Sequence, residues 1–341
     1  MATIYGGTFD SDTLTNFFNL TLPKIDKEIR DAYFKDRVFT RYMDSLGAVD
    51  RNQTGDGCYI QWEMDEGGNV DSRAFSSPIG LVAPDIHRTG VENYGEYTGA
   101  IPIDHVTLAK NSGPEKLIPY LDSYTKNMKK KISTKLNYDM MQGSGAYPAI
   151  AGLTTMISTT PTSGTIHGVS RSGKTWIQNQ QASATCSTTD GFGVVCLKDA
   201  DTLLKNATTG MGNRSMFKLA LMDKTVHTNM AYYLPDLANS QRVVINGNGS
   251  RNIPADQLKY AGENTFYFGE ALAIWDNDAP SDSIRWINPD TIRIRVLKDC
   301  DMITARREAQ NSFSKAILCG IAPMMVNLNP RYSAVLNAFS S

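Results

Sequence analysis

The sequence predicts an α+β fold, in which a long helix in the first half of the chain is combined with strands near the C-terminus. Residues 114–142 carry apolar side chains at every third or fourth position, which is the spacing of one helix face. The last third of the chain consists mainly of short apolar or alternating segments, which is typical of strands. These two patterns together indicate sheets packed with helices.

The composition is that of a globular protein without a membrane-spanning segment. The chain has 341 residues, of which 41% are hydrophobic, and its formal net charge is −1. This length is enough for two domains or one elaborate domain. The near-zero charge argues against a dedicated nucleic-acid-binding protein, which usually carries a basic face, but it permits a surface that lies near nucleic acid. No apolar run approaches 18 residues, and the N-terminus lacks the basic start and apolar core of a secretory signal.

The cysteines and histidines give no sign of a disulfide framework or a metal centre. The five cysteines are an odd number and no two are spaced as Cys-x-x-Cys, so we expect reduced, buried thiols. The four histidines are scattered and form no His-x-x-x-His pair. We therefore expect no metal, no cofactor and no catalytic residues.

The N-terminal region is expected to be an arm followed by a helix. Residues 1–20 are polar and irregular in pattern. Residues 22–46 follow, with Ile25, Ile29, Tyr33 and Phe34 near one face of a helix. The turn-rich stretch VDRNQTGDG ends this helix.

An acidic hairpin or extended loop is expected next, over Cys58–Pro78. It starts with the β-favouring run Tyr59–Met64 and turns at Glu66–Asn69. Its charges are mostly acidic, with four carboxylates against Arg73.

The helix over residues 114–142 has a lysine-rich side. Pro114 and Glu115 suit its first turn, where a missing N–H costs nothing and negative charge is favourable. At 1.5 Å per residue its 29 residues would form a rod of about 43 Å. Five of its lysines lie mainly off the apolar stripe: Lys126, Lys129, Lys130, Lys131 and Lys135.

The rest of the chain alternates between loop, helix and strand patterns. Residues 143–190 are rich in Ser, Thr and Gly and are expected to be mainly loop. A helix is expected at residues 194–209, a buried strand at 217–222, and a further helix capped by Asp223. The C-terminal strands are expected within three segments: Phe266–Trp275, Thr291–Val296 and Ala316–Leu328.

One complete motif raises the alternative of a nucleotide hydrolase. In GVSRSGKTW the residues Gly168, Gly173, Lys174 and Thr175 satisfy the P-loop pattern G-x-x-x-x-G-K-[ST]. A working P-loop lies between a buried strand and a helix, but here turn-rich residues precede it and no apolar helical stripe follows. The segment Leu219–Asp223 imitates the Mg²⁺-binding strand of such enzymes, although a core strand ending in a helix cap is far commoner. We therefore expect a non-enzymatic protein.

The order of these elements resembles the major capsid proteins of tailed bacteriophages, which have the Hong Kong 97-like fold. The 22–46 helix, the acidic hairpin, the 114–142 helix and AGLTTMIST (151–159) resemble successive parts of that family, and SKAILCGIAPMMVNLNPRYSAVL resembles its closing strands. The resemblance covers most of the chain and depends on element order more than on any one motif. It implies five regions: 1–50, N-terminal arm and first helix; 51–100, extended (E-loop) hairpin and flanking strands; 101–150, peripheral (P) domain with its spine helix; 151–270, axial (A) domain; and 271–341, returning P-domain strands and tail.

The function that the resemblance implies is structural. Many copies would form hexamers and pentamers of an icosahedral head, which encloses double-stranded DNA contacted non-specifically. The head would assemble in the bacterial host cytoplasm, with a portal and with scaffold or cement proteins as further partners. A compartment shell of the encapsulin type has the same fold and is the main alternative.

The resemblance also implies contact residues. The hairpin of one subunit would lie across its neighbour, so we expect inter-subunit contacts from Trp62, Glu63, Met64, Asp65 and Glu66 to Lys126, Lys129 and Lys130. A lysine side that is simply solvated is an equally good interpretation. Arg171 and Trp176 would anchor the GVSRSGKTW loop.

Two features depart from other members of this family. Some members form a covalent cross-link through an E-loop lysine, whereas here no lysine occurs between Lys35 and Lys110, so we expect non-covalent interfaces. Met1 lies close to the first recognisable element, so we expect no long scaffolding segment before the arm.

Overall fold

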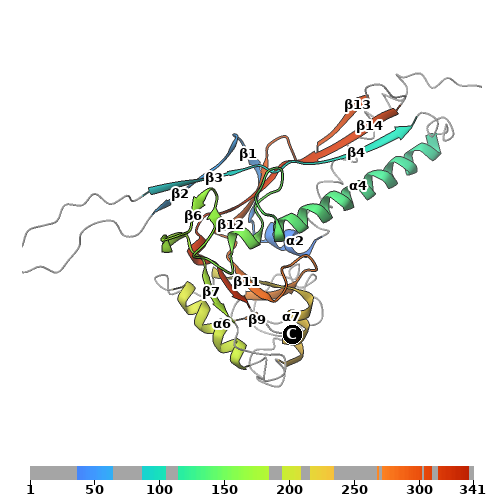
Figure 1. The fold of residues 1–341 in the computed structure, drawn as a ribbon. Coiled ribbons are helices and arrows are strands. Elements are labelled where there is room, and N and C mark those ends of the chain that lie inside the picture. The colour runs from blue at the N-terminus through green and yellow to red at the C-terminus, as the bar shows by residue number, and fades with distance from the viewer. Residues whose placement is uncertain are drawn as a thin grey trace, which may run out of the picture.

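The structure, a computed structural model, is an elongated molecule with sheets at both ends of a shared core (Figure 1). It describes residues 37–63, 87–104, 114–183, 194–208, 216–233, 267–268, 271–301, 303–308 and 314–337. The predicted arm and most of the predicted 22–46 helix lie outside these residues. The last part of that helix is α2, Val38–Ser45.

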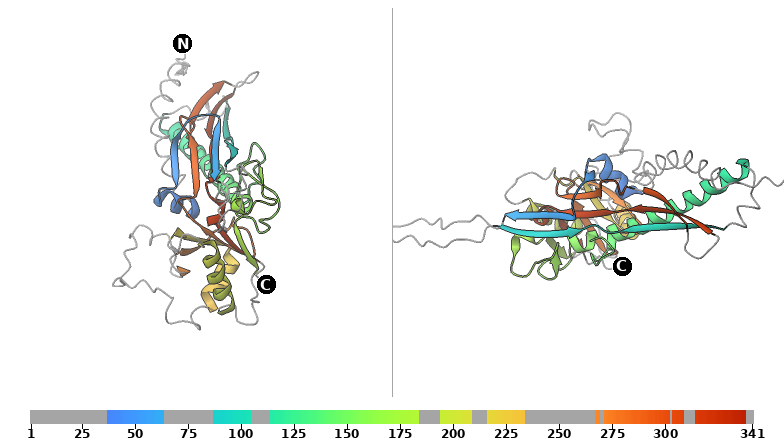
Figure 2. Two further views of the ribbon diagram at one scale, coloured as in Figure 1. Left: turned by 90° about the vertical axis from the view of Figure 1, so that its left-hand side faces the viewer. Right: turned by 90° about the horizontal axis from the view of Figure 1, so that it is seen from above.

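The longest element is helix α4, Pro114–Gln142, with the bounds that the sequence predicts. Its buried stripe of Met128, Ile132, Leu136 and Met140 recurs every four residues and packs into the main core. This core joins α4 to α2 and to the short helix α5, Leu153–Met156. Seen from above, α4 lies beside the strands β4 and β14 at one end of the molecule, while β2 and β3 extend from the other end (Figure 2).

A six-stranded sheet forms the lower part of the molecule in Figure 1, in the order β7-β16-β11-β8-β10-β9. Its central strand β8, Leu219–Met222, directs Leu219 and Leu221 into the main core and Ala220 and Met222 into a second core. Helices α6, Val194–Ala207, and α7, Lys224–Tyr233, cover the second core. The other strands are β7, Gln180–Ser183; β9, Tyr267–Phe268; β10, Ala271–Trp275; β11, Ser283–Ile287; and β16, Ala334–Asn337.

Three smaller sheets join parts of the chain that are far apart in sequence. The first has the order β1-β12-β15, the second β13-β14-β4, and the third pairs β2 with β3. Their strands are β1, Val49–Gln53; β2, Gly57–Glu63; β3, His87–Asn93; β4, Tyr97–Asp104; β12, Ile292–Leu297; β13, Ile303–Glu308; β14, Ser314–Ile321; and β15, Pro323–Asn327.

The predicted regional boundary at residue 270 does not coincide with a structural boundary. Strands β10 and β11 begin just after it, yet they flank β8 in the six-stranded sheet. Strand β16, near the end of the chain, pairs with β11 and β7 in the same sheet. Residues 271–287 and 334–337 therefore belong with the preceding region, because their backbone hydrogen bonds are made there.

Candidate interaction site

The GVSRSGKTW motif begins in a β-hairpin and does not form a phosphate-binding loop. Strands β5, Thr165–Ile166, and β6, Val169–Ser170, are joined by His167 and Gly168, whose φ angles are 46° and 78°. Two central residues with positive φ are the mark of a type I′ turn, which suits a two-residue hairpin. The first glycine of the motif is therefore explained by turn geometry.

The second half of the motif also lacks the geometry that a nucleotide requires. Thr175 begins a 3-10 turn of three residues, Thr175–Ile177, and strand β7 follows it. The amides of Arg171 and Lys174 donate to backbone carbonyls, those of Gly164 and Arg171, so they do not converge on an anion. The Asp223 carboxylate accepts from the Val226 amide at 2.7 Å, which makes it the cap of α7. Leu219–Asp223 is thus a core strand followed by a helix cap, which is the commoner interpretation of this pattern.

Arg171 holds this loop against the last residues of α5. Its side chain is buried, with 1% exposed, and its Nη2 atom donates to the carbonyls of Thr155 and Met156. Its own carbonyl accepts from Gln178 Nε2 at 2.8 Å. Burial without an acidic partner among the described residues lowers the pKa of Arg171 to about 10. The buried Arg171 guanidinium therefore contributes directional hydrogen bonds, and its loss of hydration is the free-energy cost.

His167 joins the loop to the base of the hairpin β2–β3. Its Nδ1 atom lies 2.8 Å from the Glu92 carboxylate, and its Nε2 atom accepts from the Asn327 amide at 3.0 Å. Because Nε2 accepts, the proton of the neutral ring is on Nδ1 and is donated to Glu92. The His167 carbonyl accepts from the Val91 amide at 2.9 Å. One residue thus connects the loop, β3 and β15.

Trp62 completes this arrangement and lies inside the subunit, contrary to the expected inter-subunit role. Its ring stacks on His167 with 5.8 Å between centroids, and Trp176 packs at 6.1 Å from it. Its Nε1 atom donates to the Leu328 carbonyl at 2.9 Å. Only 4% of Trp62 is exposed, so its side chain has almost no surface left for a neighbouring subunit. The reason is strand alternation, because Cys58, Ile60 and Trp62 share the buried face of β2.

The remaining expected contact residues are placed only in part. Glu63 is the last residue of β2, paired with His87; its side chain, and all of Met64, Asp65 and Glu66, lie outside the described residues. On α4, Lys126 and Lys130 are exposed, and the side chain of Lys129 is outside the description. None of the expected hairpin carboxylates lies within the described side chains, so their pairing with these lysines stays a prediction.

Sequence inspection missed an exposed apolar pair on the outer face of β2–β3. Tyr59 and Val91 are directly opposite each other across the two strands. Their exposed fractions are 71% and 41%. The exposure of Tyr59 could have been predicted from the sequence, since side chains alternate between the two faces of a strand and Tyr59 lies on the face opposite to Trp62.

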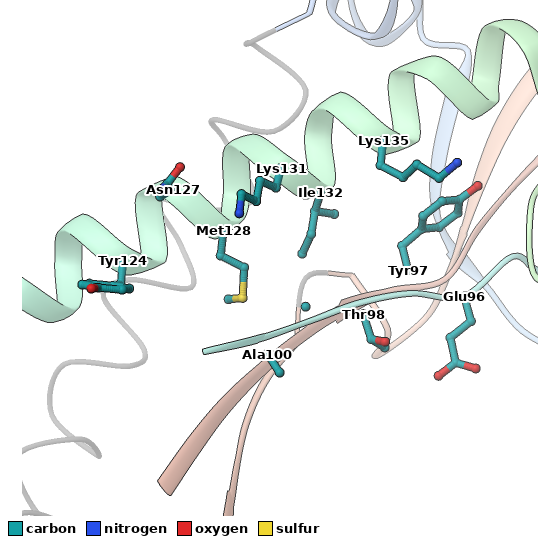
Figure 3. A pocket seen from close by; sticks show the side chains of 11 residues that line it. Glu96, Tyr97, Thr98, Ala100, Tyr124, Asn127, Met128, Lys131, Ile132 and Lys135 are labelled. Atoms are coloured by element: carbon teal, nitrogen blue, oxygen red, sulfur yellow. The ribbon is translucent and has the colours of Figure 1, made fainter. Parts of the chain in front are cut away.

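A hollow of about 570 Å³ lies between α4 and strand β4 (Figure 3). Met128 and Ile132 point from the helix toward the strand, where they approach Gly99, and Lys131 and Lys135 also line the hollow. At its inner end the Tyr97 hydroxyl donates to the Asp139 carboxylate at 2.9 Å, and Lys135 pairs with the same carboxylate at 2.8 Å. Burial, together with the Asp139 charge, raises the pKa of Tyr97, so this hydroxyl remains a donor.

The described residues contain no cluster of three or more His, Cys, Asp or Glu side chains that could hold a metal ion. Cys58, Cys300 and Cys319 are free thiols. Among the described residues, no helix combines the length and apolar content needed to cross a bilayer.

Comparison with known proteins identifies the fold. No protein-family model and no curated protein sequence matches the chain. Its structure is similar to the cyanophage A-1(L) capsid asymmetric unit, with a TM-score of 0.63 and 14% identity, over 88% of this chain and 93% of that one. It is also similar to the capsid of an empty GTA particle (TM-score 0.54, 9% identity, 87% and 89% covered) and to the capsid of Myoviridae phage XM1 (TM-score 0.52, 11% identity, 86% and 91% covered). The chain therefore has the α+β fold of phage capsid proteins.

Proposed function

We propose that this chain is the major capsid protein of a tailed bacteriophage. The observation that carries the proposal is the likeness to phage capsid subunits along nearly the whole of both chains, with a TM-score of 0.63 for the cyanophage protein. A structural role agrees with the GVSRSGKTW segment, which is folded as a pinned hairpin and offers no anion-binding loop. In this proposal the subunit has the Hong Kong 97-like arrangement, in which α4 is the spine helix and β2–β3 the root of the E-loop.

The copies would form hexamers and pentamers of an icosahedral shell around double-stranded DNA. Such a shell requires large contacts that one subunit cannot satisfy by itself. Tyr59 and Val91 supply exposed apolar surface of this kind, and we place them against a second copy. The portal, scaffold or cement proteins, and non-specifically contacted DNA are the further partners, and the location is the virion, assembled in the bacterial host cytoplasm.

The acidic hairpin would contact the lysine-rich side of α4 in the neighbouring subunit. Glu63, Asp65 and Glu66 carry the negative charge, with Met64 among them, and Lys126, Lys129 and Lys130 are the expected partners. The exposure of Lys126 and Lys130 supports this pairing. Such complementarity sets register and assembly rate more than affinity.

Charge reversal tests this contact. The substitutions Glu63→Lys, Asp65→Lys and Glu66→Lys turn the expected attraction into repulsion, so they should slow assembly and make added salt speed it instead of slowing it. Charge reversal of Lys126, Lys129 and Lys130 in the same chain should restore both the assembly rate and its original dependence on salt. Assembly that is unchanged by the first set of substitutions would contradict the proposed pairing.

Electron microscopy of the purified, assembled protein tests the function itself. A closed shell with hexamers and pentamers is expected, and in virions a DNA-filled head with a portal and tail. A shell that holds protein cargo and no DNA would indicate the encapsulin-type compartment instead. Denaturing gels of mature particles should show single subunits, because no lysine lies between Lys35 and Lys110 to cross-link the hairpin. Loss of nucleotide binding in a folded Lys174→Ala variant would contradict the structural role.

A further inference from the structure

Two carboxylates share one buried amide where α4 meets the six-stranded sheet. Asn137, on α4, donates through Nδ2 to both oxygens of Asp276, at 3.1 and 3.3 Å, and to Asp278 Oδ2 at 2.7 Å. Asp276 follows the last residue of β10 and continues the face of Leu272 and Ile274, which is the side of the main core. Asn137 is 0% exposed and Asp276 is 6% exposed, while Asp278 is half-buried. The connection between helix and sheet therefore contains two acidic groups around one neutral donor.

This arrangement has too few hydrogen-bond donors. The Nδ2 atom of Asn137 carries two hydrogens for three carboxylate oxygens. The Asp278 amide donates to Asp276 Oδ1 at 2.9 Å, but Gln142 donates to the backbone carbonyl of Asp278 and not to its carboxylate. Among the described residues, no Lys or Arg forms an ion pair with either carboxylate. A proton on one carboxyl group would supply the missing donor and remove one of two like charges.

The surroundings of Asp276 favour its protonated form. Burial raises the pKa of the Asp276 carboxyl above its usual value, and the negative charge of Asp278 adds to this rise. The hydrogen bonds from the Asp278 amide and Asn137, and the positive charge of Arg37, which precedes α2, act in the opposite direction without cancelling it. The geometry and the electrostatics therefore agree on where an added proton would be held.

The other charged groups near the two carboxylates have partners or lie on the solvent side. Asp223, at the end of the neighbouring strand β8, accepts from the Val226 amide at 2.7 Å as the cap of α7. Three lysines of α4 line an open hollow of about 540 Å³ together with Asp278: Lys130, Lys131 and Lys135. Water and salt screen charges at an open surface, whereas the buried Asp276 is screened much less. The lysines therefore act mainly on Asp278, which remains the charged member.

From these contacts we propose that Asp276 and Asp278 form a proton-binding pair, which tightens the connection between α4 and the six-stranded sheet as the pH falls. The proton taken up by Asp276 leaves one negative charge on the pair and makes Asp276 a donor to the Asp278 carboxylate. At higher pH both groups are charged, and their repulsion weakens the hold of Asn137 on the turn after β10. The inference does not depend on the capsid function, because it concerns contacts within one subunit.

The direction of the effect on stability follows from proton linkage. A carboxyl group whose pKa is raised in the folded state holds a proton there that the unfolded chain has already released. The contribution of Asp276 to stability is therefore fully present below pH 3.8, the ordinary pKa of this side chain, and is lost as the pH rises through the higher pKa of the folded state. The connection is thus stronger in acid than at neutral pH.

Urea unfolding of the full, unassembled chain at pH 4 and at pH 7.5 tests the pair. Asp276→Asn keeps the shape of the side chain, cannot be charged and supplies the N–H donor that a proton would add. This variant is expected to unfold at a higher urea concentration than the wild type at pH 7.5, and the difference should shrink at pH 4. Asp290→Asn, at an exposed carboxylate in the turn after β11, is the matched control and should give the same small shift at both pH values. An Asp276→Asn variant that is less stable than the wild type at pH 7.5, or whose shift does not depend on pH, would overturn the inference.

The second member of the pair provides an independent variant. Asp278→Asn removes the like charge, so it should also raise the urea midpoint at pH 7.5, and the double variant should gain less than the two single gains together. Fully additive gains would show two independent groups and contradict the pair. A bound divalent cation predicts the opposite pattern, in which calcium or magnesium chloride raises the midpoint of the wild type at pH 7.5 and both variants are less stable. That result would assign the two carboxylates to a metal and would also overturn the inference.

Hydrogen–deuterium exchange locates the effect within the subunit. Protection factors, which are corrected for the intrinsic pH dependence of exchange, should decrease between pH 5 and pH 7.5 in peptides that cover residues 134–145 and 271–287. The same peptides of Asp276→Asn should show no such decrease, and a peptide of β2 should be unaffected in both proteins. A decrease of equal size in all three peptides would indicate a general loss of stability and would count against a local proton-binding pair.

Discussion

Replacement of Trp62 by alanine is expected to destabilise the subunit far more than the same change at Tyr59, three residues earlier in β2. Trp62 loses a hydrogen bond to the Leu328 carbonyl, which is worth about 1 kcal/mol net. It also loses the stack on His167 and the packing against Trp176. Large-to-alanine changes of buried aromatic residues cost about 3–5 kcal/mol in total, and Trp62 belongs to this class because only 4% of it is exposed.

The control uses the other face of the same strand. Tyr59 is 71% exposed, so Tyr59→Ala should change the free energy of unfolding of the isolated chain by about 0.5 kcal/mol or less. Urea unfolding followed by circular dichroism gives both values from the shift in midpoint at constant slope. Within the proposed function, Tyr59→Ala should instead weaken assembly, while Trp62→Ala should act on folding. A Trp62→Ala variant no less stable than Tyr59→Ala would refute the placement of these two faces.

Three further predictions concern the loop, the second core and the end of α4. Arg171→Ala should lower the free energy of unfolding by about 1–3 kcal/mol, because two buried carbonyls lose their donor. Lys174→Ala, on the same loop, should have little effect. If urea melts showed Lys174→Ala to be the more destabilising of the two, the hairpin geometry would be contradicted. Burial lowers the pKa of His227 from 6.5 to about 4, so between these pH values the unfolded state takes up a proton that the folded state does not. The free energy of unfolding should therefore decrease by at most about 3 kcal/mol as the pH falls from 6.5 to 4. A His227→Gln variant should show a flatter dependence of stability on pH in this range, and equal profiles would refute the assignment. Gly143→Ala should cost about 3 kcal/mol or more, because a Cβ there would overlap the backbone oxygens of Asp139 and Ile150. Gly164→Ala, which has open space but a φ of 80°, should cost about 1 kcal/mol, and equal thermal shifts for the two glycines would count against this packing.

The sequence is most informative where a local pattern decides the structure. The stripe of Met128, Ile132 and Leu136 determines which side of α4 is buried, and the helix has the predicted bounds. Asp223 is the cap of α7 because a carboxylate before a helical pattern has an immediate local partner in the Val226 amide. The α+β class follows from such local patterns.

Contacts between distant segments are where sequence inspection falls short. Strand β2 pairs with residues 87–93, after the expected end of the hairpin at Pro78, because the hairpin spans a longer segment than its turn signal suggests. His167 is a single histidine in a Ser/Thr-rich stretch, and its partners Glu92 and Asn327 lie 75 and 160 residues away. Trp62 was expected at an interface although the alternation of Cys58, Ile60 and Trp62 pointed to the core. The predicted pairing of hairpin acids with α4 lysines remains a prediction about two subunits.

The parallel pairing of β1 with β12 has a consequence for the timing of folding. Val49 pairs with Ile294, so about 245 residues must be synthesised between the two halves of one sheet. At roughly 5–20 residues per second, β1 waits at least about 12 s on the ribosome for its partner. Such high contact order slows folding, because distant strands must meet before their pairing contributes stability. A nascent chain therefore cannot complete the sheet of β1, β12 and β15 until most of its residues have been made. Within the proposed function, a chain that stops before β12 would lack this sheet and could not form the complete surfaces needed for assembly.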